Sequence, residues 1–173
     1  SKSVNSGAQA TVNLTVQTGT ALVASTNQVV VEYTVNGTPK SMTHAATASA
    51  TQTVAIQETV NANTEIVVTG VKVQAKVTVA ENSLDTATTT TLTGNATATY
   101  NGKNKAAIES EWLDVGSTVA VVVTVPGVSG NGVTITIAGQ GTDVTTGTDV
   151  EVEGSYTVVA GTNTLTVQAG NKV

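Results

Sequence analysis

Residues 116–126 read GSTVAVVVTVP, and every side chain between Gly116 and Pro126 is small, apolar or branched at Cβ. Branching at Cβ stiffens a residue toward extended backbone, and such side chains pack well on a pleated surface. A short apolar run without alternation is typical of a strand in the middle of a sheet. The run VVV at 29–31 has the same character. We expect both runs to be central strands, covered on both faces.

The composition extends this interpretation to the whole chain. Of the 173 residues, 31 are Val and 35 are Thr, whereas Cys, Arg and Phe are absent and the one His is His44. Small aliphatic side chains fill thin layers, such as the space between two stacked sheets. The missing residue types are those on which metal, redox and acid–base sites most often depend. We therefore expect an all-β, non-enzymatic structural protein.

Most segments alternate polar and apolar residues, which predicts strands with one buried face. Asn36-Gly37 and Asn101-Gly102 favour positive φ and tight reversals, and Pro126 is expected to end its strand. Residues 103–115 could form a short helix, and the equivalent stretch 38–50 a helical turn. Many short strands at this spacing predict Greek-key β-sandwiches. The expected strands are 10–17, 28–35, 51–60, 64–69, 71–80, 87–93, 96–101, 117–125, 132–138, 148–153, 155–160 and 163–168.

The chain also matches itself at an offset of 65 residues. The three matching places pair 10–14 with 75–79, Asn36-Gly37 with Asn101-Gly102, and 53–56 with 118–121. Three matches in one register without a gap indicate a duplication.

The duplication predicts two tandem sandwiches. We place the first β-sandwich at 1–80 and the second at 81–173. Alternation from Val71 to Val79 predicts one unbroken strand, followed by a polar connection at 81–85.

Charge and hydropathy exclude other classes of partner. The net charge of −5, with no Arg, argues against a surface that follows nucleic-acid phosphates. No run of 18 apolar residues is present, so no membrane span is predicted. The absence of Cys excludes disulfides and thiolate metal sites.

Catalytic candidates are few. His44 is the one imidazole, and no G-x-S-x-G motif accompanies it. Glu109 and Glu111 stand beside Trp112; if they lay on a strand they would share a face about 7 Å apart, within the range for a glycosidase pair. Such enzymes need a deep cleft lined by aromatic rings, which this composition does not supply, so we expect solvated surface acids.

No cofactor is expected apart from a possible calcium ion. Asp143, Asp149 and Glu151 fall, with Glu153, in a stretch rich in Gly and Thr that could form an oxygen-rich loop. The alternative is a solvent-facing edge, because Glu151 and Glu153 would share one strand face. Glu81, Asn82 and Asp85 form a second candidate.

The aromatic residues define a candidate ligand surface. Sugar binding uses exposed aromatic platforms, and Tyr100 and Trp112 are the principal candidates, with Tyr33 and Tyr156 as the remaining rings. This supports an alternative function, a carbohydrate-binding or adhesive module.

Strand edges suggest a further role. Charged residues, which discourage edge-to-edge pairing, make up only 11% of the chain. The strand 10–17 could pair within its own domain, which we favour, or be donated to a neighbouring subunit.

The stretches YTVNG at 33–37, GSTVAVVV at 116–123 and VVAGTNTLTV at 158–167 resemble immunoglobulin-like modules of bacterial S-layer and cell-wall surface proteins. This resemblance implies that the chain is all-β and forms two tandem immunoglobulin-like Greek-key β-sandwiches, the first immunoglobulin-like β-sandwich at 1–80 and the second at 81–173. It also implies an extracellular, cell-surface location and a role in a layer, stalk or filament. It implies self-association, or binding to other cell-surface proteins, and possible contact with glycans. The resemblance assigns no functional residue.

Overall fold

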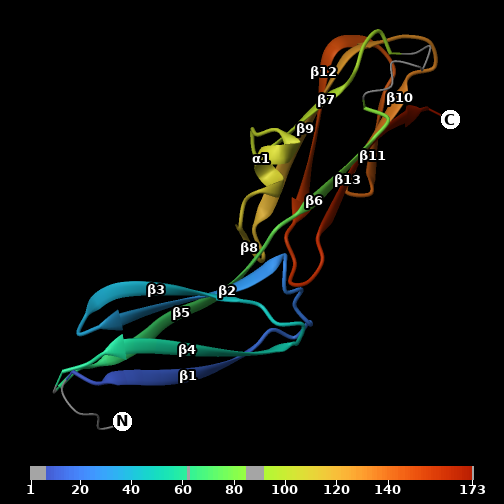
Figure 1. The fold of residues 1–173 in the computed structure, drawn as a ribbon. Coiled ribbons are helices and arrows are strands. Elements are labelled where there is room, and N and C mark those ends of the chain that lie inside the picture. Colours follow the sequence, from blue (N-terminus) through green and yellow to red (C-terminus); the bar gives the residue numbers. More distant parts are fainter. Residues whose placement is uncertain (1–6, 62, 85–91, 173) are drawn as a thin grey trace. The chain divides into compact units, whose positions relative to one another are not determined.

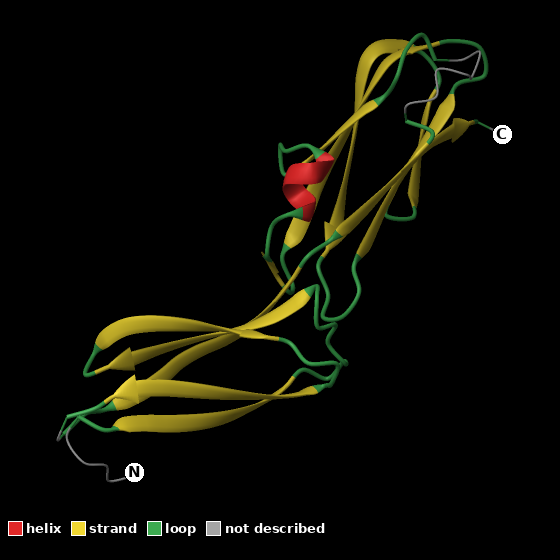
Figure 2. Cartoon of the chain, viewed as in Figure 1, coloured by secondary structure: helices red, strands yellow, loops and turns green. Residues whose placement is uncertain are grey.

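The computed structural model describes residues 7–61, 63–84 and 92–172. Strands dominate these residues, and the one helix among them, α1 (Lys105–Glu109), is short (Figure 2). The prediction of an all-β chain is therefore confirmed. Within the same residues, no helix has the length and hydropathy needed to cross a membrane.

Contacts between Cα atoms divide the chain into two compact units. The first unit comprises Ser1–Ala75 and Val159–Thr162, and the second comprises Lys76–Val158 and Asn163–Val173.

The first unit consists of two facing layers of strands. One layer pairs β1 with β4, and the other holds β3, β2 and β5 in that order (Figure 1). Val29 and Val31 of β2 and Val54 and Ile56 of β4 are fully buried in the cluster that joins the layers. The strands are β1 (Gln9–Gln17), β2 (Asn27–Val35), β3 (Thr38–Ala45), β4 (Thr51–Thr59) and β5 (Ile66–Ala75).

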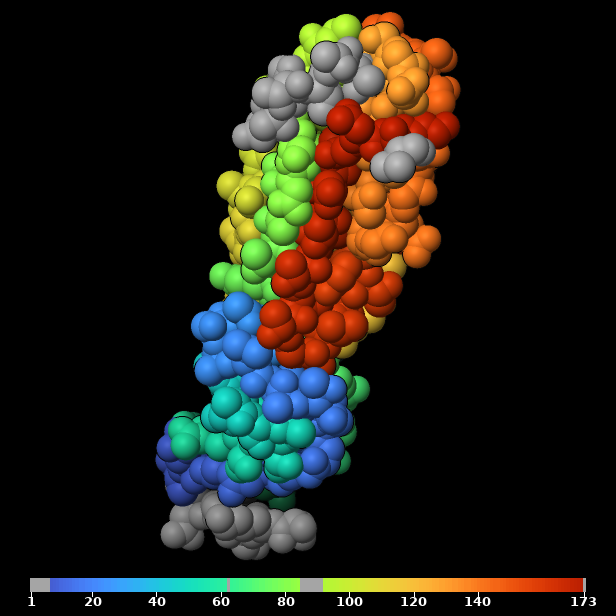
Figure 3. All heavy atoms as spheres, turned by 90° about the vertical axis from the view of Figure 1, so that its right-hand side faces the viewer, coloured from blue at the N-terminus to red at the C-terminus, as the bar shows by residue number. Residues whose placement is uncertain are grey.

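The second unit holds one sheet in the order β12-β9-β7 and another in the order β11-β10-β13-β6. Strands β6 and β13 run parallel and lie side by side, green beside dark red in Figure 3. Its strands are β6 (Thr78–Asn82), β7 (Thr97–Tyr100), β8 (Leu113–Asp114), β9 (Thr118–Val128), β10 (Val133–Ile137), β11 (Gln140–Val144), β12 (Gly147–Thr157) and β13 (Thr164–Asn171). The predicted strand 87–93 lies mostly outside the described residues.

Both predicted Asn-Gly reversals are confirmed. Asn36 and Gly37 have φ of 49° and 80°, and Asn101 and Gly102 have φ of 50° and 74°. Each Asn side chain also accepts a hydrogen bond from a distant backbone N–H: Glu65 donates to Asn36 Oδ1 at 2.8 Å, and Ala120 donates to Asn101 Oδ1 at 2.7 Å. The backbone N–H of each Asn donates to the carbonyl of the same partner residue, so each turn is held to a distant segment by side chain and backbone together.

The central position of the two apolar runs is also confirmed. Strand β2 lies between β3 and β5, and β9 lies between β12 and β7. However, the second face is only half covered, because Val30 and Val122 are partly exposed while their neighbours are buried.

Several element boundaries differ from the prediction. The stretch 38–50 does not form a helical turn, because its first part is strand β3. The stretch 103–115 does contain a helix, α1. The alternating run from Val71 to Val79 is not one strand, because β5 ends at Ala75 and β6 begins at Thr78. The two strands predicted at 148–153 and 155–160 form one strand, β12, which runs through Gly154.

Pro126 does not end its strand, which continues to Val128. The ladder between β9 and β12 skips the position where Pro126 faces Asp149, and Asp149 has a φ of 52°. Because proline has no N–H to donate, the two strands tolerate it by leaving this position unpaired.

The offset of 65 residues does not correspond to a shared strand topology. Strand β1 pairs with β4, whereas β6 and β9, which stand at the offset positions, do not pair with each other. Instead β6 pairs with β13, and β9 pairs with β7 and β12. Alternating Val and Thr produce similar strings in any strand with one buried face, so the match reflects periodicity more than equivalent position.

Candidate functional site

The structure does not assemble the predicted calcium ligands into one site. Asp143 lies on β11, while Asp149 and Glu151 lie on β12, which belongs to the other sheet of the second unit. Both carboxylate oxygens of Asp143 are already engaged: Thr134 Oγ1 donates to Oδ1 at 2.7 Å, and Lys172 Nζ lies 3.6 Å from Oδ2. Within the described residues, no three His, Asp or Glu side chains gather as ion ligands.

The second calcium candidate is incomplete in the described residues. Asp85 lies outside them. Glu81 accepts a hydrogen bond from the phenolic oxygen of Tyr100 at 2.7 Å, so its carboxylate has a structural partner.

Glu109 and Glu111 do not form a carboxylate pair. Helix α1 ends at Glu109, so the strand geometry that would place both acids on one face does not apply. Glu109 Oε2 accepts the backbone N–H of Val79 at 3.0 Å, and Glu111 is ion-paired with Lys103. Each acid therefore has its own partner.

The aromatic rings do not form an exposed platform. Tyr100 has 0% of its surface exposed and Tyr33 has 5%. Trp112 is half-buried, and Lys76 Nζ lies 5.0 Å from the centre of its ring, where the cation interacts with the ring face. The half-buried Tyr156 donates its hydroxyl to Asn163 Oδ1 at 3.0 Å. Of the two principal candidates, only Trp112 offers a ligand any accessible ring surface.

His44 lies on β3, opposite Val29 of β2. Its Nε2 atom is buried and has no hydrogen-bond partner in the structure. No acid or hydroxyl orients this imidazole through Nε2, so the arrangement needed for nucleophilic catalysis is not formed there.

A cluster of three polar side chains joins the two layers of the first unit. The hydroxyl of Tyr33 donates to Glu58 Oε1 at 2.6 Å, and Lys40 Nζ donates to Glu58 Oε2 at 2.8 Å. Lys40, and then Tyr33, hold the pKa of Glu58 below its ordinary value. The hydrogen bond to Glu58, followed by burial, raises the pKa of Tyr33 to about 12. Sequence reasoning did not predict this cluster, because its members come from three strands.

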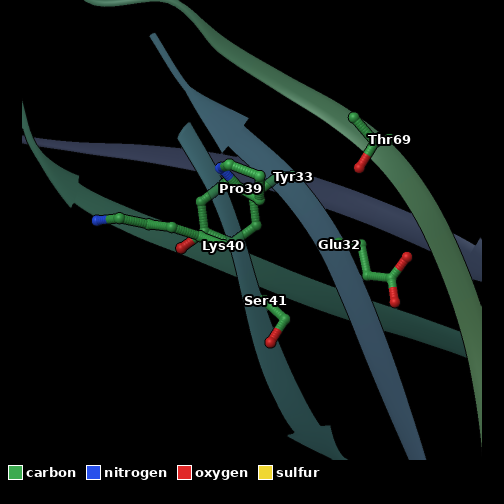
Figure 4. Close-up of a pocket in the computed structure, with 6 residues that line it drawn as sticks. All are labelled: Glu32, Tyr33, Pro39, Lys40, Ser41 and Thr69. Atoms are coloured by element: carbon green, nitrogen blue, oxygen red, sulfur yellow. The ribbon is translucent and has the colours of Figure 1, made fainter. Parts of the chain in front are cut away.

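Tyr33 and Lys40 also line an open surface hollow of about 380 Å³, shown in Figure 4. The remaining lining residues are Glu32, Pro39, Ser41 and Thr69. Lys40 is engaged by Glu58, and Glu32 lies 3.8 Å from Lys72 Nζ. The hollow therefore offers a ligand few polar groups that lack an internal partner, and we assign it no chemistry.

The remaining candidate is the outer edge of β1, which we call the β1 edge (residues 9–17). In the described residues, β1 pairs only with β4, in unbroken register from Gln9 opposite Thr59 to Gln17 opposite Thr51. The prediction that this strand pairs within its own domain is confirmed. Its core-facing side chains are nevertheless only half-buried: Ala10, Val12, Leu14 and Val16.

The β1 edge lacks the features that block pairing on other edge strands. Strand β3 carries Pro39 and Lys40 in its first residues, and β11 is only five residues long and carries Asp143. Strand β12 carries Asp149, with its left-handed backbone, and the exposed Glu151 and Glu153. Natural sheets use charge, proline and irregular backbone to discourage edge-to-edge association. The sequence QATVNLTVQ of β1 has none of them.

The other edge of the same two-stranded layer is better covered. The core-facing side chains of β4, Gln52, Val54 and Ile56, are all fully buried. Near its end, Glu58 is tied to Tyr33 and Lys40 of the facing layer. The β1 edge is thus the more exposed side of this layer.

Comparison with known proteins adds no further assignment. The chain matches no protein-family model, no curated protein and no solved structure.

Proposed function

We propose that this chain is a non-enzymatic structural subunit or module of an extracellular layer, stalk or filament, built from immunoglobulin-like sandwiches and assembled through strand edges. The observation that carries the proposal is the β1 edge, a nine-residue strand edge without charge, proline or irregularity. An all-β composition of Val and Thr with little charge suits a role based on packing and backbone hydrogen bonds.

The mechanism of assembly is strand addition. A two-stranded sheet is marginal by itself and gains from a third strand, which would satisfy the backbone groups of the β1 edge. The same strand would cover the half-buried Val12 and Leu14. Both gains arise only on association.

The alternative, a carbohydrate-binding or adhesive module, has weaker support. Tyr100 and Tyr33 are buried, and Trp112 is half-buried beside Lys76. A titration of Trp112 fluorescence with a panel of glycans tests this alternative directly. A saturable change would favour it.

The test of the proposed function is assembly of the purified chain. Sedimentation velocity over a range of concentrations, with negative-stain microscopy, is expected to show species larger than a monomer. High salt should leave them intact, because no charge pair on β1 would be screened. A chain that stays monomeric at all concentrations would refute the proposal.

A matched pair of variants locates the surface. Thr11→Lys with Thr15→Lys places two charges on β1 and should dissociate the assemblies. Gln57→Lys with Thr53→Lys places the same charges directly opposite, on β4. Because all four changes lie on one sheet, retention of assembly in the β4 variant and its loss in the β1 variant identify the β1 edge.

A further inference from the structure

We infer that the β1 edge pairs with the β1 edge of a second copy of this chain, antiparallel, about a two-fold axis at Asn13. This inference rests on the proposed function, because it names the partner of the edge on which that function depends. It adds the identity, direction and register of the added strand.

The first argument is the symmetry of the strand sequence. Read from either end, QATVNLTVQ has the same order of side-chain types around Asn13. A two-fold axis requires that each residue face its symmetry-related position in the other copy. Antiparallel pairing about Asn13 places like opposite like: Gln9 with Gln17, Ala10 with Val16, Thr11 with Thr15, Val12 with Leu14, and Asn13 with itself.

The second argument is the direction of the backbone groups. The N–H of Thr18 donates to the carbonyl of Ala50, which continues the register between β1 and β4. Backbone hydrogen-bonding groups alternate between the two edges of a strand. The N–H and C=O groups of the even-numbered residues of β1 therefore point toward β4, while their side chains point toward the core. The N–H and C=O of Asn13 therefore face the open edge, where two copies of Asn13 would exchange both hydrogen bonds.

The third argument is the chemistry of the two faces. On the core side, Val12 would lie opposite Leu14 of the other copy, which extends the apolar layer across the axis. On the outer side, Thr11 would lie opposite Thr15, a favourable cross-strand pair. An isologous contact brings identical groups together, so a charged strand would repel itself; β1 has no charge to do so.

These features favour a second copy over another strand of the chain. The edges of β3, β11 and β12 carry Lys40, Asp143 and Glu151 respectively, so pairing β1 with any of them would place a charge beside an uncharged strand. The edge strand β6 carries Glu81, and the uncharged edge strand β7 has only four residues, too few to match the nine of β1. The symmetric pair avoids this and closes on itself, so this contact alone yields a dimer.

The test uses the absence of cysteine from the chain, because an engineered thiol can only cross-link copies. In Asn13→Cys, the two Cα atoms would lie about 5.5 Å apart, as in a hydrogen-bonded antiparallel pair. Disulfides span Cα distances of about 4.4–6.8 Å. Mild oxidation should convert most of this variant to a covalent dimer.

Thr15→Cys is the matched control, since it introduces the same thiol two residues away. Its counterpart in the other copy would be four residues out of register, about 13 Å along the strand, so it should not cross-link with itself. A mixture of Thr11→Cys and Thr15→Cys should form a mixed disulfide, because these two positions face each other across the axis.

The outcomes separate the inference from the proposed function. If the unmodified chain assembles but Asn13→Cys stays uncross-linked, or Thr15→Cys cross-links equally fast, the two-fold register is wrong while edge assembly stands. If the unmodified chain never associates, the proposed function fails as well. Rapid cross-linking of Asn13→Cys alone and of the mixed pair supports the inference.

Discussion

The hydroxyl of Tyr33 donates to Glu58 Oε1 across 2.6 Å, and this bond links β2 to β4 of the facing layer. Tyr33 has 5% of its surface exposed, and Glu58 is also bound by Lys40. A hydrogen bond to a charged acceptor in such surroundings is among the stronger polar contacts of a fold.

Tyr33→Phe should therefore lower the free energy of unfolding by about 1–3 kcal/mol. Lys40→Gln should lower it by no more than about 1 kcal/mol, because the side chain of Lys40 is 44% exposed and its ion pair is screened by solvent. Urea denaturation of both variants measures the difference. Equal losses of unfolding free energy in the two variants would show that the hydrogen bond from Tyr33 stabilises the fold no more than the exposed ion pair of Lys40.

The tyrosines predict an unusual alkaline titration. The pKa of Tyr33 is raised from 10.0 to about 12, and burial raises the pKa of Tyr100 and Tyr156 as well. Phenolate absorbance of the folded protein should therefore rise at a higher pH than that of the same chain in urea. Coincident titration curves would contradict the buried, hydrogen-bonded positions of these hydroxyls.

The same shift has a consequence for stability. Between pH 10 and about 12 the unfolded chain loses the proton of Tyr33 while the folded chain keeps it. The unfolded state then binds fewer protons, so the stability contributed below pH 10 is lost as the pH rises through this window. Tyr33→Phe should reduce the loss, as measured by urea denaturation at several pH values.

Two glycines on strands of the second unit should respond oppositely to alanine. A Cβ at Gly154 would lie 2.7 Å from Ile137 Cγ2 and 2.9 Å from its Cβ, so the core must shift. A Cβ at Gly170 would meet nothing within 4 Å. Gly154→Ala should destabilise the fold by about 1–3 kcal/mol, and Gly170→Ala should be neutral or stabilising by under about 1 kcal/mol. Thermal unfolding of the pair provides the check.

Calcium should not stabilise the protein. A ligand that binds only the folded state raises the unfolding midpoint as its concentration rises. Because Asp143 and Glu151 lie on different sheets, the midpoint should be equal in excess calcium and in chelator. A saturable rise with calcium, absent with magnesium and lost in Asp143→Asn, would instead restore the calcium hypothesis.

The features that could be predicted from sequence are those determined by the conformational preferences of a few neighbouring residues. Asn36-Gly37 and Asn101-Gly102 turn because they tolerate positive φ. Helix α1 lies within the predicted range 103–115 and begins after Asn104, whose side chain caps it by accepting the N–H of Ala107 at 2.8 Å.

The features that were missed depend on partners distant in sequence. Strand β3 holds Pro39, Lys40 and Ser41, which have little strand preference, but pairing with β2 across the Asn36-Gly37 turn extends it. Gly154 predicts a break from sequence alone, yet β12 runs through it because its pairing with β9 continues, with Gly154 opposite Val121. Ile137 of the facing sheet accounts for the glycine, since it leaves no room for a side chain there.

The candidate site was predictable only in part. The sequence showed that residues 10–17 form an uncharged strand, but an edge is defined by which strands pair, and pairing is a property of the whole unit. The buried state of Tyr100 was likewise hidden, because its hydroxyl is satisfied by Glu81, far from it in sequence.

The parallel ladder between β6 and β13 determines how the second unit would bear load. Thr78 lies opposite Thr164, and Asn82 opposite Gln168, so the first and last strands of this unit point the same way. A pull on the chain before β6 and after β13 drags these strands in opposite senses along their length. The hydrogen bonds of the ladder would then be loaded together in shear rather than broken one at a time. Such a unit unfolds only when all of these bonds break together.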